Sequence, residues 1–141
     1  MNVRPLIPPF MLAALLAAGA AAGASLKPVE HETVTPAFAH AIPNIPGKVI
    51  TAAVVNYKPG GKSISHRHGS AFVVAYVLSG SIRSQLEGGE AKVYHPGESW
   101  TEAPGAHHLV SDNASATQPA SLLAIFITDS GNTKLVTYDT P

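Results

Sequence analysis

The chain of 141 residues contains no cysteine. Disulfide bonds, thiolate nucleophiles, iron–sulfur clusters and cysteine-ligated zinc are therefore all excluded. Seven histidines remain, and imidazole is a common ligand of divalent transition metals. If the protein binds a metal, we expect histidines to hold it.

Charged residues are also scarce and evenly balanced. They make up 13% of the chain, against about 25% in an ordinary soluble domain. Nine lysines and arginines offset nine aspartates and glutamates, which leaves no basic surplus to neutralise a run of phosphates. We therefore expect no nucleic-acid partner. Hydrophobic residues account for 45% of the chain, which excludes disorder driven by charge and indicates a folded domain.

The first two dozen residues have a different composition from the rest. The α-amino group and Arg4 are followed by an apolar stretch from Leu6 to Ala18, and then by small residues at the spacing of a cleavage site, Ala20, Ala22 and Ala24. This order is typical of a secretory signal. An uncleaved anchor would need about 20 uninterrupted apolar residues, but Pro8 and Pro9 break this stretch. We expect a signal peptide over 1–24, an exported (periplasmic or secreted) protein, and no stable membrane span after cleavage.

The remainder divides into a short arm and an all-β domain. Residues 25–46 carry four prolines and one short apolar patch, so we expect an N-terminal arm that packs against the domain. From Gly47 to the C-terminus, short runs rich in Val, Ile, Tyr and Thr are bounded by Gly, Pro, Asn and Asp, which is typical of β-strands. Strands are expected over 48–57, 63–68, 72–78, 81–87, 91–94, 99–102, 107–111 and 121–128, with a further one over 134–138. This spacing predicts a single antiparallel β-barrel or sandwich over 47–141.

Two of the expected strands are apolar on both faces. In the run from Phe72 to Leu78 neither alternating set of side chains is polar, and the same holds from Leu122 to Ile127. A strand with water on one side should alternate between apolar and polar residues. One face should therefore line the barrel interior, and the arm or a second copy of the chain should cover the other. A homodimer is one expectation, and a central strand under a long loop is the alternative.

The histidines form two clusters. Residues at i and i+2 of an extended segment project to the same side, so His66 and His68 can direct their imidazoles at one point. A second pair, His107 and His108, follows the turn at Pro104 and Gly105; because neighbours on a strand face opposite sides, only one of them can join the first pair. Alone, either pair could consist of surface or hydrogen-bonded core histidines. Three imidazoles converging inside a small barrel would form a divalent transition-metal site.

The spacing of these residues resembles the cupins, a family of small metal-binding β-barrels. Gly60, His66, His68 and Gly80 fall at the positions of the first cupin motif. The second motif is matched by Gly97, Gly105 and His108, with Ala103 in place of its proline and Asp112 at its end. The resemblance covers roughly residues 47–128 and implies a double-stranded β-helix, or jelly roll. It also implies a metal held by His66, His68 and His108.

The chain departs from the family at one important position. Val73 stands where the family usually carries its glutamate ligand, and it should project toward the metal. A site of three histidines can hold Fe, Mn, Zn, Ni or Cu, although losing a carboxylate weakens the retention of hard ions such as Mn. Glu98, Glu102 and His107 are close enough in sequence to join the site. We interpret all three as exposed residues at strand ends.

The resemblance implies two classes of function. An enzyme would bind a small molecule and O₂ or water at the open positions of the metal, in an oxygenase-like reaction. A non-enzymatic module would hold the metal structurally, or bind a small ligand in the barrel. A hydrolytic triad could be assembled on paper from Asp112, His108 and a nearby serine such as Ser65, but the Gly-x-Ser-x-Gly sequence around a nucleophile is missing. The residues specify no substrate, because one fold hosts many functions.

Overall fold

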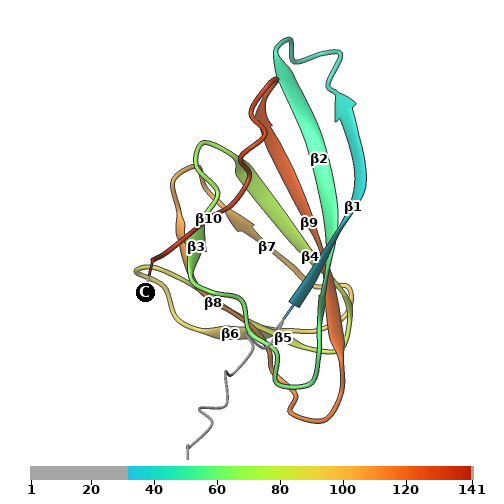
Figure 1. The fold of residues 1–141 in the computed structure, drawn as a ribbon, viewed down its shortest axis with the longest axis vertical. Coiled ribbons are helices and arrows are strands. Elements are labelled where there is room, and N and C mark those ends of the chain that lie inside the picture. Colours follow the sequence, from blue (N-terminus) through green and yellow to red (C-terminus); the bar gives the residue numbers. More distant parts are fainter. Residues whose placement is uncertain (1–31, 141) are drawn as a thin grey trace, which may run out of the picture.

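The computed structural model describes residues 32–140; the expected signal peptide and the first residues of the arm lie outside the described residues. Ten strands form two five-stranded antiparallel sheets that face each other (Figure 1). The first sheet has the order β1-β2-β9-β4-β7, with β1 (Glu32–Ala41), β2 (Lys48–Tyr57), β9 (Ala120–Asp129), β4 (Phe72–Ser79) and β7 (Ser99–Glu102). The second has the order β10-β3-β8-β5-β6, with β10 (Thr137–Tyr138), β3 (His66–Arg67), β8 (His107–Asn113), β5 (Ile82–Leu86) and β6 (Lys92–Tyr94).

The all-β antiparallel architecture predicted from the sequence is confirmed. The predicted bounds of β2 and β7 agree with the structure at both ends, whereas β3 is reduced to two residues. The span 32–140 contains no helix, and so none that is long and apolar enough to cross a membrane.

The segment expected to be an arm forms the edge strand β1. It pairs antiparallel with β2 over its whole length, with a shift in register between Pro36 and Phe38. Proline cannot donate a backbone hydrogen bond, which argues against a strand in the sequence, but a sheet edge and an irregularity in register both tolerate it. Because β1 extends the sheet sideways, it does not lie across the outer face of β4. On that face Phe72, Tyr76 and Leu78 are 37–43% exposed.

The hydrophobic core lies between the two sheets. β4 contributes Val73, Ala75 and Val77, and β9 contributes Leu122 and Phe126, all at most 4% exposed. These side chains are alternate residues of their strands, as period-2 geometry requires of a face that is buried. The candidate metal ligands His66, His68 and His108 line a cavity together with some of these core residues.

Gly80 lies at a turn that requires glycine. It occupies the two-residue connection between β4 in the first sheet and β5 in the second, with φ at +70°. A Cβ atom there would lie 2.5 Å from the carbonyl oxygen of Pro119. Both the left-handed backbone and the close approach require a residue without a side chain.

Candidate metal centre

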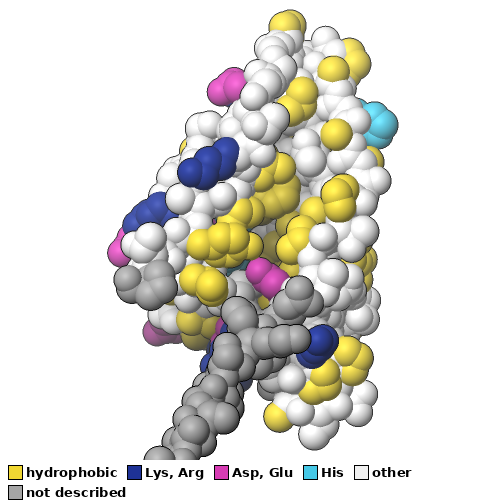
Figure 2. Space-filling model, in the orientation of Figure 1, with side chains coloured by type: hydrophobic (Ala, Val, Ile, Leu, Met, Phe, Trp, Pro, Cys, Tyr) yellow, Lys and Arg dark blue, Asp and Glu magenta, His cyan; other side chains and the backbone are white. Residues whose placement is uncertain are grey.

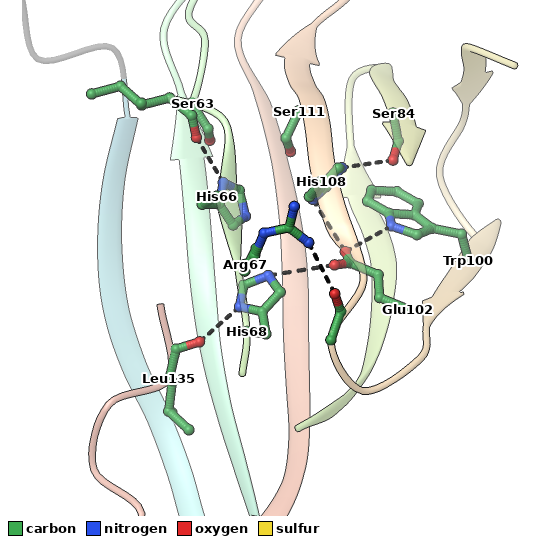
Figure 3. A network of polar contacts seen from close by, with 12 residues as sticks. Ser63, His66, Arg67, His68, Ser84, Trp100, Glu102, His108, Ser111 and Leu135 are labelled. Carbon is green, nitrogen blue, oxygen red and sulfur yellow. Dashed lines mark hydrogen bonds and ion pairs between the residues drawn. The ribbon is translucent and has the colours of Figure 1, made fainter. Parts of the chain in front are cut away.

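The structure brings His66, His68 and His108 together in one buried cluster (Figure 3). His66 on β3 is the direct cross-strand partner of His108 on β8, and His68 follows one residue after β3. The potential ligand atoms of the three rings lie within 4.8 Å of one another, and each residue is at most 8% exposed. The i, i+2 spacing and the antiparallel pairing together produce this convergence.

Backbone carbonyls orient two of the three rings. Nδ1 of His66 donates to the carbonyl oxygen of Ile64, and Nδ1 of His68 donates to that of Leu135, each at 2.7 Å. In a neutral ring this arrangement leaves Nε2 unprotonated and able to bind a metal. Such hydrogen bonds to the remote nitrogen are a regular feature of metal-binding histidines, because they fix both the tautomer and the ring orientation.

His108 is oriented differently. Its Nε2 lies 2.8 Å from the hydroxyl oxygen of Ser84, within hydrogen-bonding distance. Its Nδ1 is buried, has no hydrogen-bond partner, and lies 3.2 Å from Oε1 of Glu102. The side of the ring that carries Nδ1 therefore faces a carboxylate (Figure 3).

Glu102 belongs to this cluster, and its interpretation as an exposed strand-end residue is wrong. It is 2% exposed, and its Oε2 lies 3.5 Å from Nε2 of His68. Along β7, Trp100 and Glu102 face inward while Ser99 and Thr101 are exposed. Because residues at i and i+2 share a face, the bulky Trp100 is the one sequence signal that could have indicated an inward-facing Glu102.

The other two residues weighed for the site lie outside it. Glu98 is exposed and accepts a hydrogen bond from the backbone N–H of His95 at 2.7 Å. His107 is half-buried, and its Nε2 lies 2.9 Å from the hydroxyl of Ser65 and 2.7 Å from Oδ2 of Asp139. His107 therefore ties the C-terminal segment to the second sheet and is not directed at the metal-ligand candidates.

The hydrolytic triad considered from the sequence does not form. Asp112 lies 3.7 Å from the ammonium group of Lys62, and the hydroxyl of Ser111 hydrogen-bonds to Tyr57 at 2.8 Å. Ser65 contacts His107 and not His108. A triad needs a serine hydroxyl at one ring nitrogen of the histidine and a carboxylate at the other. Asp112, Ser65 and Ser111 do not supply these contacts to His108.

Burial and neighbouring charges control protonation in the cluster. Burial lowers the pKa of His66, and the adjacent His108 and His68 lower it further. Burial acts to raise the pKa of Glu102, but the nearby imidazoles of His108 and His68 and the indole N–H of Trp100 outweigh it, so this pKa is lowered. An unprotonated imidazole and an ionised carboxylate are the forms that bind a metal.

The residues present fit a divalent transition metal. Oε2 of Glu102 and Nδ1 of His108 are buried side-chain atoms without a hydrogen-bond partner. Buried polar atoms nearly always have a hydrogen-bond or metal partner, so two unpaired atoms that face the same cluster indicate a place for a bound ion. Imidazole nitrogens with a carboxylate oxygen are a donor set that Fe, Mn, Zn, Ni and Cu all accept.

A cavity of about 140 Å³ opens onto the cluster. The three histidines and Glu102 line it together with apolar side chains such as Val55, and Figure 2 shows apolar side chains gathered around a hollow in this face of the molecule. Glu32 also lines it. No lysine or arginine of the described span 32–140 lines this cavity.

Several solved structures have a similar fold. An oxalate oxidase in complex with the substrate analogue glycolate is 20% identical, with a TM-score of 0.56 over 72% of this chain and 56% of that one. TT1209 from Thermus thermophilus is 24% identical, with a TM-score of 0.56 over 70% of this chain and 84% of that one. The DMSP lyase DddQ from Ruegeria pomeroyi is 21% identical, with a TM-score of 0.52 over 61% and 44% of the two chains. This chain thus spans little more than half of the oxalate oxidase, and the likeness shows the fold alone.

A family model described as Cupin domain matches residues 53–126, which is more than half of the chain. The matched region contains all three clustered histidines and Glu102. A search of curated proteins finds no match. The two facing antiparallel sheets, the histidine cluster between them and the family match agree, and the chain belongs to the cupin family.

Proposed function

We propose that this cupin holds one divalent transition metal through His66, His68 and His108 and acts on a small, uncharged, largely apolar molecule. The observation that carries the proposal is the apolar cavity that opens onto three buried imidazoles. A pocket with apolar walls and a few convergent polar groups is the usual form of a small-molecule site.

The chemistry of the site divides between metal and protein. A bound metal would supply Lewis acidity or redox chemistry, and three imidazoles leave coordination positions for an oxygen-bearing ligand. The carbonyls of Ile64 and Leu135 hold the rings of His66 and His68 in place. The apolar walls exclude water from the reacting atoms, which favours an oxygenase-like reaction on an apolar substrate.

The charges around the cavity favour an uncharged substrate. A carboxylate buried without a partner loses several kcal/mol of hydration free energy. The proposed metal could pair with one carboxylate, but the lining residues of the described chain offer no lysine or arginine for a second, and Glu32 and Glu102 would repel it. A dicarboxylate should therefore bind poorly, whereas a neutral molecule with a hydroxyl or carbonyl oxygen suits the pocket.

The alternative function is a non-enzymatic module whose metal is closed to ligands. Nitric oxide separates the two, because it binds ferrous iron only where a coordination position is open. We expect the protein loaded with Fe²⁺ under anaerobic conditions to give the EPR signal of an iron–nitrosyl species, and a cavity-filling apolar alcohol to perturb that signal. A fully loaded protein that gives no such signal would favour the closed, structural site.

We also propose that the mature chain is exported and self-associates. The N-terminal composition supports export, and the exposed Phe72, Tyr76 and Leu78 on the outer face of β4 support a second copy as the cover. Native mass spectrometry of the protein recovered from an exporting host should show a dimer of chains that begin near residue 25. A chain that retains Met1 would refute export, and a monomer at micromolar concentration would refute association.

A further inference from the structure

We infer that Glu102 is a fourth metal ligand, a carboxylate supplied by β7 in place of the one that position 73 of β4 lacks. The inference rests on the proposed metal site and adds a residue that the histidine motifs do not predict. It assigns a role to a buried acid that contacts the cluster and has no other charged partner.

The register of the sheet places Glu102 beside position 73. β4 and β7 are antiparallel, and Val73 is the direct cross-strand partner of Glu102. Both residues face inward, at 1% and 2% exposure, and both line the cavity. Cross-strand partners have Cβ atoms about 4.5–5.5 Å apart. A glutamate at 102 can therefore reach the space that a glutamate at 73 would occupy.

The contacts of the carboxylate are those expected of a ligand. Oε1 accepts a hydrogen bond from Nε1 of Trp100 at 3.2 Å, which anchors one side of the group. Oε2 lies 3.5 Å from Nε2 of His68 and accepts no hydrogen bond. Figure 3 shows the carboxylate between His68 and His108, directed into the cluster. One oxygen is held by the protein, and the other remains free to bind a metal.

The charge balance of the pocket favours a bound cation. A buried carboxylate is costly unless it is paired with a positive charge or fully hydrogen-bonded. The carboxylate of Glu102 accepts a hydrogen bond from Trp100 and lies 3.2 Å from Nδ1 of His108 and 3.5 Å from Nε2 of His68, which carry a positive charge only when protonated. No lysine or arginine of the described residues lines the cavity. A divalent metal among the three imidazoles would provide that charge.

A fourth, anionic ligand changes which metals the site favours. With three neutral imidazoles alone, hard ions such as Mn²⁺ should be held weakly. A carboxylate oxygen is the hard ligand that Mn²⁺ and Fe²⁺ prefer, and it lowers the net charge at the metal by one. The chain would thus keep the donor set of three histidines and one glutamate, with the glutamate on a different strand.

The test compares Mn²⁺ binding by the wild-type chain, Glu102→Gln and Glu98→Gln, using calorimetry and the EPR spectrum of the bound ion. Gln keeps the size of the side chain and removes the charge. We expect Glu102→Gln to weaken Mn²⁺ binding by about 100-fold, the upper range for loss of a group that supports a metal site, and to change the EPR spectrum. Glu98→Gln, at an exposed residue immediately before β7, should behave as wild type.

An exchange variant, Val73→Glu with Glu102→Val, returns the carboxylate to β4 and should bind Mn²⁺ within about tenfold of wild type, since a ligand is moved and not lost. Equal affinity and identical spectra for wild type and Glu102→Gln would overturn the inference and leave the three-histidine site intact. Should Glu102→Gln not fold, Glu102→Met, which also keeps the approximate size and removes the charge, takes its place, and Mn²⁺ affinity equal to that of the wild type would overturn the inference. A wild-type chain that binds no metal would refute the proposed function itself.

Discussion

Replacing His66 and His68 together by alanine should reduce the metal content from about one first-row ion per chain to none. The change removes two of the three imidazoles whose ligand atoms lie within 4.8 Å of one another. His108 and Glu102 alone would leave most coordination positions to water. Elemental analysis of the purified proteins, after loading with each candidate metal and desalting, measures the effect.

The control for this experiment is a double variant of two histidines outside the cluster, His95→Ala with His107→Ala. It removes the same number of imidazoles but should keep full metal content. The variant in the cluster also loses the hydrogen bond from His68 to the Leu135 carbonyl, so circular dichroism must show that it remains folded. A folded His66→Ala, His68→Ala chain that retains one metal ion would show that the site lies elsewhere.

The sequence predicted most of the strands because their patterns are local. β2 and β7 are bounded by turn residues and rich in β-branched or aromatic side chains, and their ends agree with the prediction. β1 escaped prediction because Pro36 cannot donate to a ladder, and only its place at the sheet edge makes it acceptable. Whether a strand lies at the edge or in the centre of a sheet depends on the assembled sheet, and the sequence of a single segment does not reveal it.

The histidine cluster was predictable and Glu102 was not, for a physical reason. The convergence of His66 and His68 follows from their spacing in the chain, which is local information. The position of Glu102 depends on the pairing of Val73 with Glu102 across β4 and β7, which no local pattern specifies. The alternation from Trp100 to Glu102 indicated that the side chain faces inward, but not which residues it meets there.

Val73→Glu should destabilise the metal-free protein strongly and the metal-loaded protein little. The new carboxylate would lie directly opposite Glu102 on a face where both residues are at most 2% exposed. Like charges in that arrangement repel, and an uncompensated buried charge costs about 3–5 kcal/mol. A divalent cation held by the three imidazoles would bind both carboxylates and offset most of this loss. Thermal unfolding with a chelator and with excess Mn²⁺ measures the two states.

Val77→Glu is the matched control, because it lies on the same strand and the same buried face but does not line the cavity. Its carboxylate would be equally desolvated and out of reach of the metal, so Mn²⁺ should not rescue it. A rise in the unfolding temperature on adding Mn²⁺ that is large for Val73→Glu and absent for Val77→Glu would place position 73 at the metal. Equal destabilisation of Val73→Glu with and without Mn²⁺ would instead show that this position does not face the ion. The inference that Glu102 replaces a metal ligand at position 73 would then fail.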